Sequence, residues 1–307
     1  MTATSTACGN SPPAPPVTPG GTPSRSRRCP KAARSSSPRS NADPPHDEGT
    51  APVAVELKPR RPRPSWHKLT VSRVRPLTED AVEVTLAVPE HLRPAFDFKP
   101  GQHLTFQRVE ADGSEVRRSY SLASTPRELA EAGTLRLGIR SIPKGTFSGY
   151  ANRQLVPGDV LEVLPPLGHF WTEIRPDRHY GSVVAGSGIT PIIAIATAAL
   201  DAGATVTLLY SNRTEDSTMF AAELRELQRL HGPRLRLHHI RTRSDGGAPL
   251  LTGRLTPERL RAFLAADVDP ADIDEWFLCG PYEMVLGVKE VLEDAGADQI
   301  HTELYTV

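Results

Sequence analysis

The sequence is poor in cysteine, in aromatic residues and in long apolar runs. Among its 307 residues there are three cysteines, Cys8, Cys29 and Cys279, so it offers no Cys-x-x-Cys pair or four-cysteine set for a zinc site, a disulfide framework or an iron–sulfur cluster. The longest apolar run, residues 192–200, contains a threonine and is far shorter than the roughly 20 residues of a membrane helix. The adjacent histidines, His238 and His239, would project to opposite faces of a strand. We therefore predict no metal centre, no membrane segment and a soluble, cytoplasmic protein.

The chain also lacks an excess of charge of either sign. It has 36 basic and 36 acidic residues, which argues against nucleic acid or an anionic membrane as the main partner. The charges are unevenly spread, because residues 1–64 carry ten of the basic and four of the acidic groups. The rest of the chain is therefore mildly acidic, with a net charge of −6.

Residues 1–64 differ in composition from everything that follows. They contain 14 of the 30 prolines, many Ser, Thr and Arg residues, and few large apolar ones. Such a segment cannot bury enough surface to offset its chain entropy, so we predict a disordered tail. Its arginines and serines resemble those of a transit peptide, but the prolines interrupt any amphipathic helix. We interpret it as a solvated tail or an overextended translation start.

Residues 65–177 contain short stretches in which apolar and polar residues alternate, bounded by Pro and Gly. The alternation is clearest in residues 69–71, 81–88, 103–106, 135–139 and 159–164. This pattern is typical of antiparallel strands. With little sign of helix between them, the strands predict a small β-barrel.

Residues 178–307 alternate between predicted strands and predicted helices. The strands are expected at 182–185, 205–210, 234–240 and 275–279, and the helices at 191–200, 218–230, 257–265 and 282–294. Such alternation predicts right-handed crossovers and a doubly wound parallel sheet. The predicted fold is thus an antiparallel barrel followed by an α/β domain.

The turn after the first strand of the second domain reads Gly186-Ser187-Gly188-Ile189-Thr190-Pro191. Its glycines let backbone N–H groups come close to a ligand, and Thr190 as N-cap with Pro191 at the first helical position predicts a helix N-terminus suited to a diphosphate. The third glycine of the usual dinucleotide fingerprint is missing. An ordinary tight turn is the alternative interpretation.

Ser211-Asn212-Arg213 ends the second predicted strand, where an NAD-specific site would have an acidic residue against the ribose 2′-hydroxyl. A serine and an arginine suit a 2′-phosphate and favour NADP over NAD. The neighbouring Glu215 and Asp216 weaken this argument, and an ordinary polar loop is the alternative.

Three further segments are candidates for ligand binding. Arg118 and Tyr120 are expected on one face of a strand. The tyrosine ring could then stack on a flat heterocycle while the arginine pairs with a phosphate of the same ligand. The alternative is that Tyr120 only covers the barrel and Arg118 is solvated. Gly145-Thr146-Phe147-Ser148 precedes a short helix predicted at 148–153, where Ser148 either helps to bind phosphate or simply caps the helix. Cys279-Gly280-Pro281 lies at the carboxyl end of a predicted strand, where open α/β sheets bind ligands, although a buried cysteine is more often a packing residue.

Taken in order, these motifs resemble the ferredoxin–NADP reductase family over residues 66–307. Within it, residues 100–103, 117–122, 210–214 and 301–305 are most similar to the reductase subunits of phenylacetyl-CoA epoxidases, which suggests a link to phenylacetate degradation. Those subunits carry a C-terminal ferredoxin domain with four cysteines that this sequence lacks. We therefore expect a separate ferredoxin-like protein or oxygenase iron–sulfur component as electron acceptor.

The resemblance implies an FAD on the barrel and an NADPH, or alternatively an NADH, on the second domain. The FAD-binding residues it implies are Arg118, Tyr120, Ser121, Leu122, Ile139, Gly145, Thr146, Phe147 and Ser148. The implied nucleotide-binding residues are Gly186, Ser187, Gly188, Ile189, Thr190, Pro191, Ser211, Arg213, Cys279, Gly280 and Pro281. The hydride-transfer site would be formed by Ser121, Cys279, Glu303 and Tyr305, with Tyr305 either covering the flavin ring or sealing the domain interface.

The function that follows is an FAD-dependent NAD(P)H oxidoreductase that passes a hydride from NADPH to FAD and then single electrons to its partner. One alternative is a diaphorase or flavin reductase without a dedicated ferredoxin. Another is a non-catalytic docking subunit of an oxygenase, with the basic tail as tether. The presence of both Arg118 and Tyr120 argues against the docking subunit, because an inactive flavin site would have no reason to keep them.

Overall fold

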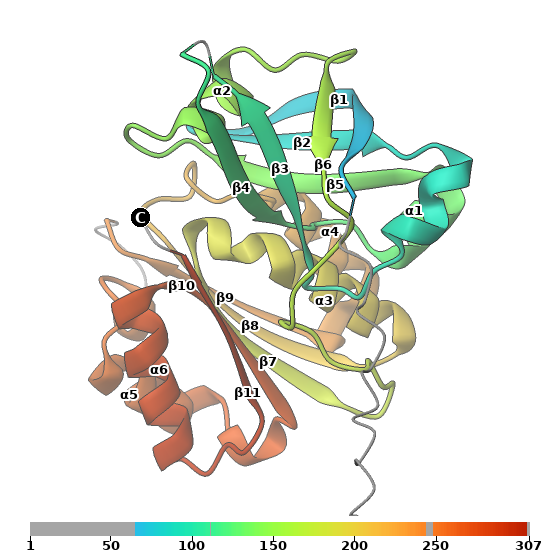
Figure 1. The fold of residues 1–307 in the computed structure, drawn as a ribbon. Coiled ribbons are helices and arrows are strands. Elements are labelled where there is room, and N and C mark those ends of the chain that lie inside the picture. Colours follow the sequence, from blue (N-terminus) through green and yellow to red (C-terminus); the bar gives the residue numbers. More distant parts are fainter. Residues whose placement is uncertain (1–64, 111, 244–247, 306–307) are drawn as a thin grey trace, which may run out of the picture. The chain divides into compact units, whose positions relative to one another are not determined.

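The computed structural model describes residues 65–110, 112–243 and 248–305, which all belong to one compact unit, Arg61–Val307. The predicted tail, residues 1–64, lies outside the described residues. The described chain contains an antiparallel sheet followed by a parallel sheet with helices (Figure 1). The predicted fold class is confirmed.

The antiparallel sheet has six strands in the order β4-β3-β6-β1-β2-β5. Its two edge strands meet where Leu122 forms a bridge with Leu137 and the Ala123 amide donates to the Arg136 carbonyl over 2.8 Å. This pairing closes the sheet into the predicted barrel. The strands are β1 (His67–Thr78), β2 (Ala81–Ala87), β3 (His103–Val109), β4 (Glu115–Ser121), β5 (Thr134–Arg140) and β6 (Val160–Val163).

The barrel core follows from the period-two pattern of its strands. Along β3, for example, Leu104 and Phe106 are fully buried while Thr105 and Gln107 are partly exposed. Successive side chains of a strand point to opposite faces, so alternate apolar residues collect on the inside.

Helices of the barrel domain depart from the prediction in two places. Helix α1 (Pro126–Ala132) was not predicted, although Thr125 and Glu128 form a complete capping box at its start. Helix α2 (Thr146–Arg153) begins two residues before the predicted start, with Gly145 as its N-cap. Ser148 therefore does not cap it; its hydroxyl instead accepts a hydrogen bond from the Ile142 amide over 3.4 Å. A short 3₁₀ helix spans Glu90–Phe96.

The second sheet has five parallel strands in the order β11-β10-β7-β8-β9. Strand β11 was not predicted: it lies at the sheet edge and carries several polar residues, so its apolar signal is weak. The strands are β7 (His179–Ala185), β8 (Thr205–Asn212), β9 (Leu235–Arg241), β10 (Glu275–Pro281) and β11 (Ile300–Tyr305). The helices are α3 (Ile189–Ala202), α4 (Ala221–His231), α5 (Pro257–Asp267) and α6 (Tyr282–Asp294), with 3₁₀ turns at Gly186–Gly188, Gly232–Arg234, Pro249–Leu251 and Pro270–Asp272.

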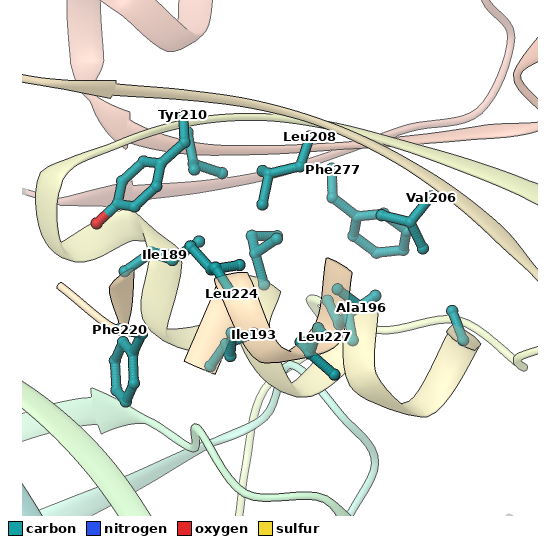
Figure 2. Close-up of a cluster of buried hydrophobic side chains, with 14 of the residues drawn as sticks. Ile189, Ile193, Ala196, Val206, Leu208, Tyr210, Phe220, Leu224, Leu227 and Phe277 are labelled. Atoms are coloured by element: carbon teal, nitrogen blue, oxygen red, sulfur yellow. The ribbon is translucent and has the colours of Figure 1, made fainter. Parts of the chain in front are cut away.

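Both faces of the parallel sheet are covered. Leu208 and Phe277 point to the face with α3 and α4, where they join Ile193 and Leu224 in one apolar cluster (Figure 2). Their neighbours along the strands, such as Leu209 and Leu278, join the opposite cluster with residues of α5 and α6. Burial on both faces explains why these strands read as continuous apolar runs.

His238 and His239 of β9 project to opposite faces, as their adjacency predicts. The ring of His238 lies 4.9 Å from that of Phe263 on α5, and the ring of His239 lies 6.1 Å from that of Tyr210 on β8. Within the described ranges, no three His, Cys, Asp or Glu side chains are grouped so that they could hold a metal ion. None of the helices in those ranges is long and apolar enough to span a membrane.

The cluster between α4 and the sheet gives a test of the fold. Leu224→Ala should lower the free energy of unfolding by about 2–5 kcal/mol, because Leu224 is completely buried there and its loss leaves a cavity. Leu230→Ala, the same change on the same helix at a side chain that is 59% exposed, should cost less than about 0.5 kcal/mol. Urea denaturation measures both, and equal losses would contradict this packing.

Candidate functional site

A cavity of about 430 Å³ lies where the barrel meets the carboxyl ends of the parallel strands. Several predicted site residues line it: Arg118, Tyr120, Ser121, Ser148, Ser187, Thr190, Glu303 and Tyr305. Lining residues that the sequence did not single out are His103, Ser119, Gly138, Arg140, Ile142 and Leu304. The strand order reverses between β7 and β10, so the cavity opens at the topological switch point, where open α/β sheets bind ligands.

Tyr120 forms an aromatic wall of the cavity and rests on the barrel core. Its ring centroid lies 6.0 Å from that of Phe106 and 5.5 Å from that of the buried Phe147. Burial raises the pKa of Tyr120 to about 12, against a smaller lowering by Arg118, so the phenol stays neutral. The exposed Arg118 side chain donates to the Arg117 carbonyl over 2.7 Å and lines the same cavity. A flat ring and an exposed cation therefore lie side by side.

The glycine turn after β7 has a different local structure from the predicted one. Gly186–Gly188 form a 3₁₀ turn that runs directly into α3 at Ile189, so the N-cap is Gly188 and not Thr190. The Thr190 hydroxyl donates back to the Ser187 carbonyl over 2.9 Å. The Ile189 amide donates to the Gly186 and Ser187 carbonyls, and within the part of the chain that the structure describes no side chain caps the start of the 3₁₀ turn, so an anion here would be bound by the leading amides of the turn itself.

Close packing around this turn demands its glycines. A Cβ on Gly188 would lie 2.3 Å from the Cys279 carbonyl oxygen, and one on Gly186, whose φ is +55°, would lie 2.9 Å from Arg140 Nη1. The Tyr210 hydroxyl on β8 donates to the Gly186 carbonyl over 3.0 Å and anchors the turn to that strand. The turn is thus fixed between β10, β8 and an arginine of the barrel.

A polar cluster forms where the end of β4 meets β11. The Ser121 hydroxyl donates to Glu303 Oε2 over 3.0 Å, and His103 Nδ1 lies 4.0 Å from Glu303 Oε1. The strand registers produce this arrangement, because His103 pairs with Ser121 across β3 and β4, and Cys279 pairs with Glu303 across β10 and β11. Three of the four predicted transfer residues, Ser121, Cys279 and Glu303, therefore meet around one carboxylate.

Burial dominates the acid–base properties of this cluster. It raises the pKa of Glu303, lowers the pKa of His103, and raises the pKa of the Cys279 thiol far above its ordinary value, with a further increase from Glu303. It also raises the pKa of Tyr305. Cys279 is thus an unreactive thiol, because the thiolate is the nucleophilic form. Glu303 is the carboxyl group of this cluster, and its pKa is raised above the ordinary value of 4.5.

Other predicted residues do not line the cavity. Leu122, Ile139 and Phe147 lie in the barrel core, and Thr146 is the first residue of α2. A Cβ on Gly145 would lie 2.2 Å from Ser148 Oγ, so that loop packs tightly. Gly186, Gly188, Ile189, Pro191, Cys279, Gly280 and Pro281 form the surrounding turn and strand end.

Ser211 and Arg213 lie at the end of β8, away from the cavity lining. Ser211 is buried, whereas the Arg213 guanidinium is half exposed and contacts Asp80 of the barrel.

Arg140 is the most informative residue that the sequence did not reveal. It ends β5, donates to the Ser217 carbonyl over 2.7 Å, and reaches the glycine turn of the other domain. The alternation along β5 places its side chain opposite to the buried Ile139. Nothing local to β5, however, tells which segment of the second domain lies there.

These elements define a class of protein: a β-barrel and a dinucleotide-type parallel sheet with a tyrosine-lined cleft between them. Residues 68–171 match the family described as oxidoreductase FAD-binding domain, and residues 183–290 match the oxidoreductase NAD-binding domain. The chain belongs to the ferredoxin reductase family of FAD- and NAD-binding oxidoreductases. The predicted family and the FAD and pyridine-nucleotide cofactors are thereby confirmed.

The named relatives include a subunit of an epoxidase and the ferredoxin reductase component of a monooxygenase. The chain is 36% identical to the E component of the 1,2-phenylacetyl-CoA epoxidase of Escherichia coli over 78% of this chain and 68% of that protein. It is 35% identical to the ferredoxin reductase component of 3-ketosteroid-9-alpha-monooxygenase of Rhodococcus rhodochrous over 77% of this chain and 64% of that protein. The chain thus matches about two thirds of the length of these relatives.

Solved structures share the fold. An Amycolatopsis cytochrome P450 reductase has a TM-score of 0.64 and 27% identity, covering 80% of this chain and 72% of that one. A ferredoxin NADP⁺ reductase from Neisseria gonorrhoeae with bound FAD and NADP has a TM-score of 0.65 and 24% identity, covering 78% and 98%.

The residues present fit the two cofactors of the family. Tyr120 lines the cavity, Arg118 is an exposed cation beside it, and the glycine turn before α3 has no side-chain cap among the described residues and is closely packed. A flat heterocycle joined to a diphosphate needs this combination of groups.

The buried carboxylate gives a pH-dependent prediction. A raised pKa in the folded chain means that Glu303 holds its proton in the native state at pH values where the unfolded chain, with the ordinary value of 4.5, has lost it. The wild type therefore loses stability as pH rises through this window. Glu303→Gln removes the effect and still accepts from Ser121, so its Tm relative to wild type should increase from about pH 5 to about pH 8.

Glu173→Gln is the matched control, because Glu173 is exposed and pairs with the exposed Lys99. Its Tm difference from wild type should be constant over the same range. A constant difference for Glu303→Gln as well would contradict the assignment of a buried carboxylate at this site.

Proposed function

We propose that the chain is an NADPH-dependent flavoprotein reductase that transfers electrons to a separate iron–sulfur protein or oxygenase component. The observation that carries this proposal is the cavity in which Tyr120 and Ser121 of the barrel face Ser187 and Thr190 of the glycine turn. A flavin on the first pair and a nicotinamide held by the second would meet in one enclosed space. Positioning of this kind is the main contribution a protein makes to hydride transfer.

FAD, when bound, takes a hydride from the nicotinamide and releases electrons singly. In this proposal Arg118 pairs with the FAD pyrophosphate and Tyr120 packs against the isoalloxazine. The loop Gly145–Ser148 would surround the same pyrophosphate, and the turn Gly186–Pro191 would hold the diphosphate of NADPH. Cys279, Gly280 and Pro281 border the nicotinamide, and Ser211 and Arg213 lie toward the 2′-phosphate.

The polar cluster would manage protons at the edge of the flavin. The Ser121 hydroxyl donates to Glu303 Oε2, and the raised pKa of that carboxyl lets it keep a proton to higher pH than an exposed glutamate does. His103, whose pKa is lowered by burial, stays neutral and lies on the other side of the carboxyl group. Tyr305 lines the same cavity and would cover the flavin in the absence of nicotinamide.

The partner is proposed from the relatives. Two of them are named as an epoxidase component and a monooxygenase ferredoxin reductase component, and a carbazole 1,9a-dioxygenase ferredoxin reductase shares the fold with a TM-score of 0.62. We assign this chain the same kind of role, with phenylacetate degradation as the pathway and the cytoplasm as the location. The domain limits that go with it are 65–177 for the FAD domain and 178–307 for the nucleotide domain.

Flavin retention tests the site. The double variant Arg118→Ala, Tyr120→Ala should bind FAD roughly tenfold or more weakly, since it loses both the charged phosphate contact and the stacking ring. Absorbance of the purified protein and FAD titration measure this. Arg118→Ala alone, at an exposed side chain, should show part of the loss without disturbing the core.

Arg117→Ala is the matched control on the same strand, where the guanidinium pairs with Glu115 and Gln107. It should keep its flavin. Unchanged flavin content in the double variant would refute the proposed FAD site.

A further inference from the structure

Asp80, in the turn between β1 and β2, holds two arginines with one carboxylate. Its Oδ2 lies 2.9 Å from Arg213 Nη2, and its Oδ1 lies 3.1 Å from Arg140 Nε. The Thr78 hydroxyl donates to Oδ1 over 2.8 Å and fixes the carboxylate. Arg213 belongs to the parallel-sheet domain, whereas Asp80 and Arg140 belong to the barrel.

These contacts lie at the edge of the sheet where the adenosine end of a dinucleotide is proposed to bind. Arg213 directly follows β8, and Arg140 reaches both the Ser217 carbonyl in the loop after β8 and Gly186 in the glycine turn. The Arg213 side chain is 50% exposed and that of Asp80 is 35% exposed. A ligand can therefore reach the Asp80–Arg213 ion pair from solvent without a rearrangement of the fold.

The carboxylate stays charged under all ordinary conditions. Burial by itself would raise its pKa, but the Thr78 hydroxyl, Arg140 and Arg213 together hold the pKa of Asp80 below the ordinary value of 3.8. A 2′-phosphate, with a charge of about −1.5 to −2 near neutral pH, must either displace this carboxylate from Arg213 or bind beside it against repulsion. An uncharged 2′-hydroxyl meets no such penalty, and a carboxylate can accept its hydrogen bond.

We propose that Asp80 is a specificity-determining residue for the nucleotide. Its carboxylate, which belongs to the barrel, forms an ion pair with Arg213 and thereby weakens the preference for NADPH over NADH. This inference rests on the proposed nucleotide site at residues 186–191 and 211–213. It refines the proposed electron donor, because a protein that contains Asp80 is expected to accept NADH as well as NADPH. The preference is set by a residue of the flavin domain, outside the segment that contacts the adenosine.

Calorimetric titration of the FAD-loaded full chain with 2′,5′-ADP and with 5′-AMP tests the inference without turnover. Asp80→Asn keeps the shape of the side chain and its contact with Thr78 but removes the charge. It should tighten 2′,5′-ADP about three- to fivefold and leave 5′-AMP unchanged. In an Arg213→Ala background the same substitution should have a smaller effect, because the cation that it releases is absent and only the repulsion by the carboxylate is relieved.

Asp112→Asn is the matched control. Asp112 lies in another turn of the barrel, between β3 and β4, and contacts the Ser114 hydroxyl as Asp80 contacts that of Thr78. Removing its charge should change neither affinity.

Two results would overturn the inference. Unchanged affinity of Asp80→Asn for 2′,5′-ADP, or equal weakening of both nucleotides, would mean that the carboxylate only tethers the domains. Failure of both nucleotides to bind to the wild type and to every variant, with FAD still bound, would instead refute the proposed nucleotide site on which the inference rests.

Discussion

The hydrogen bond from Ser121 to Glu303 joins residues 182 positions apart in the chain over 3.0 Å. It forms only if β4 ends at the closed edge of the barrel and β11 adds to the parallel sheet in register with β10. Each of these conditions rests on long-range strand pairing, and each fixes one side of the cavity. The candidate site is therefore a product of the contact between the two sheets more than of any single motif.

A second contact, also made by β5, joins the barrel to a helix of the parallel-sheet domain. Arg136 of β5 pairs with Glu83, Glu128 and the α4 residue Glu223 at 2.9, 2.7 and 2.9 Å. Such a half-buried charge cluster contributes little net stability, because desolvation offsets much of the attraction. Its geometry does select one orientation of α4 against the barrel.

The sequence predicted the elements whose signals are local. Alternation indicated the barrel strands, and the helix from Tyr282 to Asp294 was predicted with its actual bounds. The prediction that Thr190 caps α3 was wrong, because the 3₁₀ turn at Gly186–Gly188 leads directly into α3 at Ile189. Helix α1 and the polar edge strand β11 were not predicted. The roles of Arg140 and Asp80 could not be predicted from the sequence, because they depend on which distant segment of the chain lies opposite these residues.

The central claim, that this cavity holds a flavin which pyridine nucleotide reduces, is tested most directly by the visible absorbance spectrum of the purified protein before and after anaerobic addition of NADPH. The account predicts an oxidised-flavin band that bleaches on addition. A protein that carries no flavin, takes up no added FAD, or keeps an unchanged flavin band in the presence of both NADPH and NADH would contradict it.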